Sequence, residues 1–254
     1  MSSVAVTREG RIAWLELARP EKRNAVDQGM RAELKAALGE LAEDRAVRVV
    51  ILVGAGKSFC AGVDLKDAKA PDHPLAPGLE RLTKDLDDFP KPTIAAIQGN
   101  AVGGGCELAL ACDIRVAGGD ARFALPEVKI GSLPGSGGTQ RLASSVSASD
   151  SALIVLTGAP VDAAEAFRIG LVSRLVDEGQ ERVAAREIAE QIAANAPLST
   201  LAAKAALRAA REPLGEQGGL AVERLLWAVL FGSEDRKEGR TAFREGRAPR
   251  FEGR

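Results

Sequence analysis

Histidine and cysteine are scarce in this sequence, and their scarcity narrows the chemistry that the protein can perform. The chain contains one histidine, His73, and three cysteines, Cys60, Cys106 and Cys112. His73 lies in a polar loop, where an exposed side chain is expected, so a Ser–His or Cys–His nucleophilic pair is not expected. The cysteines show neither a disulfide framework nor metal-ligand spacing, and no His/Cys/carboxylate cluster suggests a zinc site. The sequence therefore predicts neither a metal nor a redox cofactor.

Long apolar runs and an excess of one charge are also absent. The chain has 34 basic and 35 acidic residues, a balance that argues against a nucleic-acid surface. No run is long and apolar enough to span a bilayer, and the first residues lack the basic region and apolar core of a secretory signal. We therefore expect a cytoplasmic protein that binds neither nucleic acid nor membrane.

Two glycine-rich stretches lack the residues that would make them nucleotide sites. Residues 103–108 (GGGCEL) lack the third glycine of a dinucleotide fingerprint, and residues 131–139 (GSLPGSGGT) lack the lysine of a phosphate loop. Their glycines therefore predict a different kind of site.

Strand and helix patterns alternate through the first two-thirds of the chain, which favours an α/β fold. The chain has 254 residues, 46% of them hydrophobic, enough for a substantial core. Helical spacing follows an N-cap at Asp27, recurs from Leu79 to Phe89, and begins again near Thr139. From Glu178 onward the pattern is almost entirely helical. Strands are expected at residues 4–6, 11–17, 47–53, 93–97, 114–117, 121–125 and 171–176.

Residues 98–112 (QGNAVGGGCELALAC) are the stretch around which the chain is organised. An apolar strand pattern precedes three glycines, and a short helical pattern that holds Glu107 follows them. Glycine lets the backbone approach a ligand closely, and the first N–H groups of a helix lack internal partners and favour negative charge. The stretch can therefore offer N–H donors to a developing anion. From these residues alone, a tight strand-to-helix turn with a solvated glutamate is the simpler interpretation.

Several ordered motifs together resemble the enoyl-CoA hydratase (crotonase) family. They are residues 19–25 (RPEKRNA), 59–65 (FCAGVDL), 103–108 (GGGCEL), 126–131 (PEVKIG), 134–141 (PGSGGTQR) and 242–245 (AFRE). The resemblance covers nearly the whole chain and is specific, because the motifs agree in order and spacing. It implies a crotonase-like spiral of ββα units over residues 1–197. It also implies a C-terminal helical region over residues 198–254 that builds homotrimers, usually paired into homohexamers.

The resemblance also assigns roles around the reacting carbons. The backbone N–H groups of Val63 and Gly104 would form an oxyanion hole for the thioester oxygen. Glu107 and Glu127 would hold the water, and we assign water activation to Glu107 and proton donation to carbon to Glu127. Two carboxylates in one apolar site can hold different protonation states, although they titrate as a pair. Taken alone, Glu127 after Pro126 would be a turn carboxylate.

Contacts to the rest of the substrate follow from the same resemblance. Arg23, Ala25 and Ala61 would contact the CoA moiety, which is part of the substrate, so no separate cofactor is expected. Trp227 would line the acyl pocket, although its helical spacing is equally typical of a core residue. One position departs from the family pattern: Gly246 stands where a lysine often contacts the CoA phosphates, and Arg244 or Arg247 would have to replace that lysine.

The implied function is that of a hydro-lyase, an enoyl-CoA hydratase. It would add water reversibly across the 2,3 double bond of a 2-enoyl-CoA thioester to give 3-hydroxyacyl-CoA, in fatty-acid or related acyl-CoA degradation. An enoyl-CoA isomerase or a specialised acyl-CoA dehydratase of the same family stays open. A non-catalytic acyl-CoA- or RNA-binding homologue is disfavoured by the retention of both glutamates and by the balanced charge. The residues do not encode acyl-chain length.

Overall fold

The computed structural model describes residues 2–65, 78–212 and 214–254, and in these residues its framework is a six-stranded sheet in the order β1-β2-β3-β4-β6-β9. His73 and most of the 66–79 loop lie outside the described residues. β1 and β2 pair antiparallel, and the other neighbouring pairs are parallel. The strands are β1 (Val4–Glu9), β2 (Ile12–Leu17), β3 (Val49–Gly54), β4 (Thr93–Ile97), β6 (Ile114–Gly118) and β9 (Arg174–Val176).

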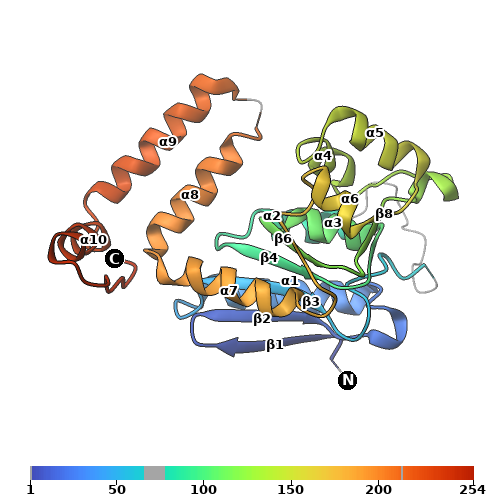
Figure 1. The fold of residues 1–254 in the computed structure, drawn as a ribbon, viewed down its shortest axis with the longest axis horizontal. Helices are drawn as coiled ribbons and strands as arrows, with labels where there is room; N and C mark the ends of the chain where they lie inside the picture. Colours follow the sequence, from blue (N-terminus) through green and yellow to red (C-terminus); the bar gives the residue numbers. More distant parts are fainter. Residues whose placement is uncertain (1, 66–77, 213) are drawn as a thin grey trace.

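Helices cover both faces of this sheet, which is why its parallel strands are apolar on both sides. One face carries Leu15, Leu52 and Ile97 into the main core with α1 (Gln28–Glu43), α2 (Leu79–Asp87) and α3 (Gly104–Ala111). The other face carries Trp14 and Ile51 against α7 (Glu181–Ala194). Figure 1 shows α7 running along the sheet, and it packs on this second face. Successive residues of a strand point to opposite faces, so Trp14 and Leu15 enter different cores.

A second, three-stranded sheet stands beside the first and positions the candidate site. It consists of β5 (Asn100–Val102), β7 (Arg122–Ala124) and β8 (Val161–Asp162), with β5 and β7 parallel. The short helices η2 (Glu127–Ile130), α4 (Gly138–Ala143), α5 (Ala148–Thr157) and α6 (Ala163–Arg168) follow β7 in chain order.

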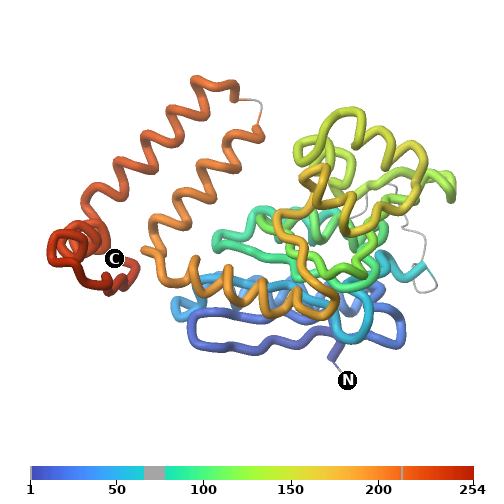
Figure 2. The backbone as a smooth tube through the Cα atoms, in the orientation of Figure 1, coloured from blue at the N-terminus to red at the C-terminus, as the bar shows by residue number. Residues whose placement is uncertain are grey.

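The last helices extend away from the sheets, as the backbone tube shows (Figure 2). α8 (Pro197–Ala209) and α9 (Gly215–Phe231) pack against each other as an antiparallel pair, and α10 (Glu234–Glu245) lies at the far end (Figure 1). Arg48 ties the chain's end back to the core, since its guanidinium donates to the carbonyls of Ala193 and Phe251. No residue of α9 is buried within a single chain.

Most expected elements are confirmed, and the differences have local causes. Asp27 caps α1 by accepting the Met30 N–H at 2.7 Å, and Asp162 caps α6 by accepting that of Glu165 at 2.9 Å. β9 is shorter than the expected strand at 171–176. The helix expected near Thr139 is two helices, because Ser147 caps a new one. Among the described residues, no helix has the length and apolar character that crossing a bilayer requires.

Candidate active site

Three short backbone segments lie side by side at the site, and each one ends in a sequence motif. Cys60 forms a parallel bridge with Ala101 of β5, through hydrogen bonds from Cys60 N–H to Asn100 and from Val102 N–H to Cys60. β5 pairs with β7 in turn, and the Gly103 N–H donates to the Ala124 carbonyl at 2.8 Å. This register brings together the starts of the motifs that carry Val63, Gly104 and Glu127.

Backbone pairing directs the N–H group of Val63 toward Gly104. Val26 donates to the Gly62 carbonyl at 2.7 Å and accepts from the Asp64 N–H at 3.0 Å. Because neighbouring residues of a strand point their polar groups in opposite directions, the Val63 N–H faces away from Val26. The Val63 nitrogen lies 3.5 Å from the point where a β-carbon on Gly104 would stand.

The Gly104 N–H is the second donor of this pair. Gly104 is the first residue of α3, where an N–H group has no partner within the helix. Within the described parts of the chain, the Val63 N–H makes no backbone hydrogen bond either. The predicted oxyanion-hole residues are therefore adjacent, and both N–H groups can donate a hydrogen bond to a ligand oxygen.

Glycine is required at the start of α3 for steric reasons. A β-carbon on Gly105 would stand 2.1 Å from the carbonyl oxygen of Cys60, and Gly103 has a φ of 55°. Only glycine adopts such a backbone and permits such an approach without strain. The glycines therefore place α3 directly on the Cys60 segment.

Glu107 lies in the first turn of α3 and is 2% exposed. Its Oε1 accepts the backbone N–H groups of Ser136 at 2.7 Å and Gly138 at 2.9 Å. Burial raises the pKa of Glu107, while these two hydrogen bonds and the charge of Arg141 oppose that rise because they favour the ionised form. Glu107 is therefore buried, so the simpler interpretation of a solvated glutamate is wrong. Its two N–H partners and Arg141 offset part of the cost of burying its charge.

Glu127 is the first residue of η2, shortly after β7, and faces the glycine turn. Its Oε1 is 3.0 Å from the point where a β-carbon on Gly103 would stand, and its Oε2 is buried without a hydrogen-bond partner among the described residues. Burial raises the pKa of Glu127, and the charge of Glu107 raises it further. The two carboxyl groups therefore interact, and each one disfavours the ionised form of the other.

Arg23, Ala25 and Ala61 line one cavity of about 420 Å³ together with Val63. The Ala61 N–H donates to the Arg23 carbonyl at 2.9 Å, and the Ala25 N–H donates to the Lys22 carbonyl at 3.1 Å. These N–H groups are used inside the chain, so a ligand in the cavity would meet carbonyl or side-chain groups of these residues.

Two residues that support this cavity were not singled out from the sequence. Asn24 is fully buried and donates through Nδ2 to the carbonyls of Ala55 and Ser58. Arg19 donates to the Ala25 carbonyl at 2.6 Å and pairs with Asp27 and Asp64 at 2.9 and 3.2 Å. Both belong to the motif at 19–25, so the motif was visible while its supporting role required tertiary contacts.

The structure does not bring Trp227 to the carboxylates within one chain. Trp227 is 54% exposed on α9, where its ring lies 5.4 Å from that of Phe231. α9 packs on α8 and stands away from α3, the helix of Glu107 (Figure 1). With α9 in this position, the acyl-pocket contact predicted for Trp227 is not formed within one chain.

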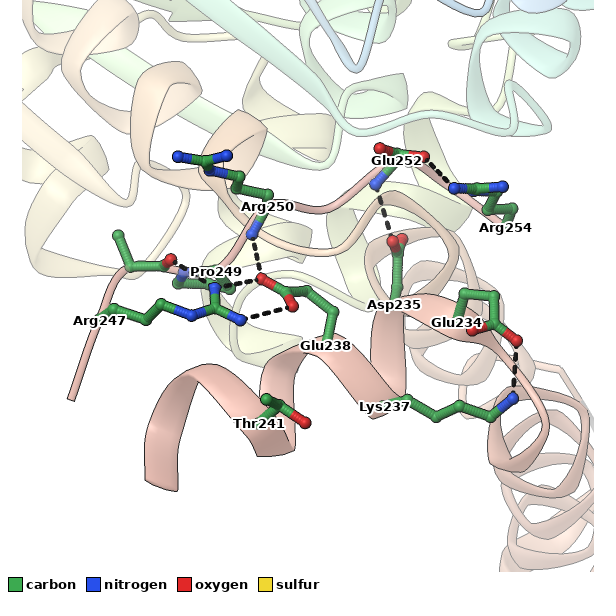
Figure 3. Close-up of a pocket in the computed structure, with 11 residues that line it drawn as sticks. Glu234, Asp235, Lys237, Glu238, Thr241, Arg247, Pro249, Arg250, Glu252 and Arg254 are labelled. Carbon is green, nitrogen blue, oxygen red and sulfur yellow. Dashed lines mark hydrogen bonds and ion pairs between the residues drawn. The ribbon is translucent and has the colours of Figure 1, made fainter. Parts of the chain in front are cut away.

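A second cavity, of about 850 Å³, lies between α10 and the chain's last residues (Figure 3). Its charges largely neutralise one another. Arg247 forms two hydrogen bonds with Glu238, at 2.6 and 2.9 Å, and also pairs with Glu245. Asp235 accepts the N–H groups of Glu252 and Gly253. These partnered side chains give the cavity a structural role.

Comparison with known proteins agrees with the geometry. The family model described as enoyl-CoA hydratase/isomerase matches residues 7–254. The chain is 42% identical over 258 residues to the 2,3-dehydroadipyl-CoA hydratase of Escherichia coli, covering 100% of both chains. It is 43% identical over 247 residues to the (E)-benzylidenesuccinyl-CoA hydratase of Thauera aromatica, covering 95% of this chain and 96% of that one. A crystal structure of enoyl-CoA hydratase from Bacillus anthracis superposes with a TM-score of 0.93 at 34% identity, covering 99% of this chain and 100% of the other.

An α/β fold that sets two adjacent backbone N–H groups beside the buried Glu107 and the half-buried Glu127 suits acyl-thioester chemistry. The chain belongs to the enoyl-CoA hydratase/isomerase (crotonase) family. Its enzyme class is that of a hydro-lyase, and its substrate class is acyl-CoA.

Proposed function

We propose that the protein adds water reversibly across the 2,3 double bond of a 2-enoyl-CoA thioester to give 3-hydroxyacyl-CoA, in fatty-acid or related acyl-CoA degradation. The observation that carries the proposal is the adjacency of the Val63 and Gly104 N–H groups to two interacting carboxyl groups, the buried Glu107 and the half-buried Glu127. The cytoplasmic location expected from the sequence stays a prediction.

The proposed reaction uses each of these groups once. Glu107 takes a proton from water, and the resulting hydroxide bonds to C3 as the electrons of the double bond move toward the thioester carbonyl. The N–H groups of Val63 and Gly104 stabilise the enolate oxygen, and loss of one such donor in other enzymes costs about a hundredfold to a thousandfold in rate. Glu127 then delivers a proton to C2, which re-forms the carbonyl.

The surroundings of the two carboxyl groups support this division of roles. Two backbone N–H groups point at Glu107 and favour its ionised form, which a base requires. Glu127 receives no such support at its buried Oε2, and burial together with the charge of Glu107 favours its protonated form, which an acid requires.

Substitution of the two glutamates tests the proposal. Glu107→Gln and Glu127→Gln should each lower hydration of crotonyl-CoA by roughly a hundredfold or more. The double variant should lose far less than the product of the two, because groups that act as a unit are non-additive. Glu165→Gln, on the exposed surface of α6, is the control. Near wild-type hydration by Glu127→Gln would contradict the proposal and favour isomerisation, which needs a single carboxylate.

The acyl group can be identified by a turnover screen. The panel should contain straight-chain 2-enoyl-CoA substrates of increasing length. It should also contain 2,3-dehydroadipyl-CoA and (E)-benzylidenesuccinyl-CoA, which the names of two relatives specify. The preferred substrate is the one with the highest kcat/KM.

For the CoA moiety, we propose that Arg23, Ala25 and Ala61 form the binding cavity and that Arg244 replaces the family lysine. Arg247 is held by the carboxylates of Glu238 and Glu245, whereas Arg244 donates to the neutral Thr241 hydroxyl at 3.3 Å. Arg244→Gln should therefore raise KM several-fold with little change in kcat. Arg247→Gln should leave KM nearly unchanged, and equal effects on KM would contradict the assignment.

We further propose that residues 198–254 build a homotrimer or homohexamer, and that Trp227 contributes to an acyl pocket across a subunit contact. Support comes from α9, which buries no residue within one chain and exposes Trp227 and Val229 by 54% and 78%. Exposed apolar surface of this kind marks an interaction site.

A further inference from the structure

The hydrogen bonds that orient Glu107 come from a loop that is distant in sequence. Its Oε1 accepts from Ser136, just before α4, and from Gly138, the first residue of α4. The position of this loop therefore decides where the carboxylate points and how strongly its charged form is supported. Whatever holds the loop acts on Glu107 without touching it.

Two side chains hold the loop through one carbonyl group. The Ser136 carbonyl accepts a hydrogen bond from Thr83 Oγ1 at 2.7 Å and another from Arg141 Nη1 at 2.9 Å. Thr83 is fully buried on α2, and its hydroxyl also lies 3.0 Å from the Glu80 carbonyl. A hydroxyl has one proton, and the shorter contact assigns it to Ser136.

Arg141, on α4, links the loop to α2. Its Nη2 donates to the Thr83 carbonyl at 3.4 Å, and its Nε lies 3.7 Å from the carboxylate of Asp87. The guanidinium passes so close to Gly137, which has a φ of 93°, that a β-carbon there would stand 2.2 Å from Nη1. Glycine at 137 thus allows Arg141 to lie directly on the loop.

We propose that Thr83 and Arg141 are positioning residues for the hydration reaction, because they fix the Ser136 carbonyl and thereby hold the Ser136 and Gly138 N–H groups on Glu107. This inference rests on the proposed function. Neither residue needs to touch substrate. A displacement of the loop by about 1 Å would misalign the carboxylate, and misplacements of that size cost roughly a hundredfold in rate elsewhere.

Thr83→Val keeps the shape of the side chain and removes the hydroxyl, so it is the decisive variant. It should lower kcat for crotonyl-CoA about tenfold or more, with KM changed less than twofold, and Thr83→Ser should recover most of the loss. Thr200→Val on α8 is the matched control, because the Thr200 hydroxyl donates within its own helix, to the Pro197 carbonyl at 2.9 Å. If the role of Thr83 were purely structural, Thr83→Val would lower the melting temperature and leave the kcat of the folded fraction unchanged.

Coupling to Glu107 separates positioning from general weakening. In a Glu107→Gln background, Thr83→Val should cause little further loss, because the carboxylate it orients is gone. Losses that multiply instead would overturn the proposal. Arg141→Met should behave like Thr83→Val, with a larger effect, since it removes a hydrogen bond and a positive charge near Glu107.

Titration of Glu107 gives a readout that does not depend on turnover. Its carboxyl infrared band can be assigned by its absence in Glu107→Gln. The charged and titratable groups that face it are Arg141, Glu127, Cys106 and, beyond Arg141, Asp87. With its N–H donors loosened in Thr83→Val, Glu107 should titrate at higher pH than in the wild type. If Thr83→Val changes neither the titration of Glu107 nor kcat, the inference is wrong. If the wild type hydrates no enoyl-CoA, the proposed function is wrong.

Discussion

The Cδ2 methyl of Leu79 lies 2.3 Å from the point where a β-carbon on Gly104 would stand. Leu79 is the first residue of α2, and its side chain is buried over the start of α3. The same point is 3.5 Å from the Val63 nitrogen. A side chain at position 104 would therefore collide with Leu79 and crowd the donor pair at the same time.

Gly104→Ala should consequently impair both stability and activity. Overpacking of a core typically costs about 1–3 kcal/mol, and Leu79 can absorb part of it by rotating. The hydration rate should fall by at least about tenfold, because the added methyl group intrudes beside the oxyanion position. Thermal unfolding and crotonyl-CoA kinetics measure the two effects. In a Leu79→Ala background, Gly104→Ala should cost little further stability, because the clash with Leu79 is gone. The hydration activity of the double variant should stay low. Full recovery of activity would show that the clash alone mattered.

Gly105→Ala should be more damaging to the fold. Its β-carbon would stand 2.1 Å from a backbone oxygen, that of Cys60, which cannot rotate away. We expect a loss of more than about 3 kcal/mol in unfolding free energy, or no folded protein. Gly39→Ala is the matched control, because Gly39 lies inside α1 with no atom near its β-carbon position. That change should stabilise the helix by about 0.5–1 kcal/mol. Similar melting temperatures for the two variants would contradict the steric argument.

The three cysteines should resist alkylation in the native protein. All three are buried, and burial raises the pKa of each thiol to about 12. At pH 8 the thiolate fraction is therefore on the order of one in ten thousand. Iodoacetamide should label all three quickly in urea and hardly at all in buffer, as mass spectrometry can measure. Rapid native labelling would show that the α3 region opens.

Local patterns were sufficient for most of the elements, whereas the two glutamates were singled out through the family resemblance. The strand expected at residues 93–97 is β4, and the helix expected after the glycines is α3. β5 was not predicted, because three residues beside a glycine turn carry too little alternation to indicate a strand. Its pairing with β7 is a tertiary contact, and this contact is what sets Glu127 against Gly103.

The residues that hold the site in place could not be predicted from local sequence patterns, because their contacts are also tertiary. The N–H groups on Glu107 come from residues about thirty positions away, and Thr83 reaches Ser136 over a separation of 53 residues. Nothing in the helical spacing of Thr83 distinguishes it from an ordinary buried threonine. The placement of Trp227 likewise depends on how α9 packs, which its apolar periodicity does not specify.

The proposed oligomer predicts that α9 tolerates charge poorly. Leu225 and Val229 are spaced four residues apart on one face of the helix and are 69% and 78% exposed within one chain. Light scattering of the wild type should give a trimer or hexamer at micromolar concentration. Leu225→Glu/Val229→Glu should dissociate it, since two charges would be buried without partners. Glu216→Gln, at the start of the same helix, should leave the assembly intact. A wild-type monomer would contradict the role assigned to residues 198–254.

Glu127→Gln should stabilise the folded protein at neutral pH while it impairs hydration. Burial raises the pKa of Glu127 above that of the unfolded chain, and the charge of Glu107 adds to the rise. Between the two pKa values the folded state binds more protons than the unfolded state, so the free energy of unfolding falls as pH rises through that window and stays lower above it. Glutamine removes this penalty. The melting temperature of the variant should therefore exceed that of the wild type at pH 8, and the difference should vanish toward pH 4.

The matched control, Glu165→Gln, should change the stability at pH 8 in the opposite direction. A hydrogen bond from Arg168 lowers the pKa of Glu165, so Glu165 contributes stability that is present at neutral pH and is lost as pH falls through its folded pKa. Glu165→Gln should therefore melt at or below the wild-type temperature at pH 8. Scanning calorimetry from pH 4 to pH 8 measures both variants. A Glu127→Gln protein that is less stable than the wild type across this range would show that the carboxylate is held by favourable contacts, and that its place in the site is structural.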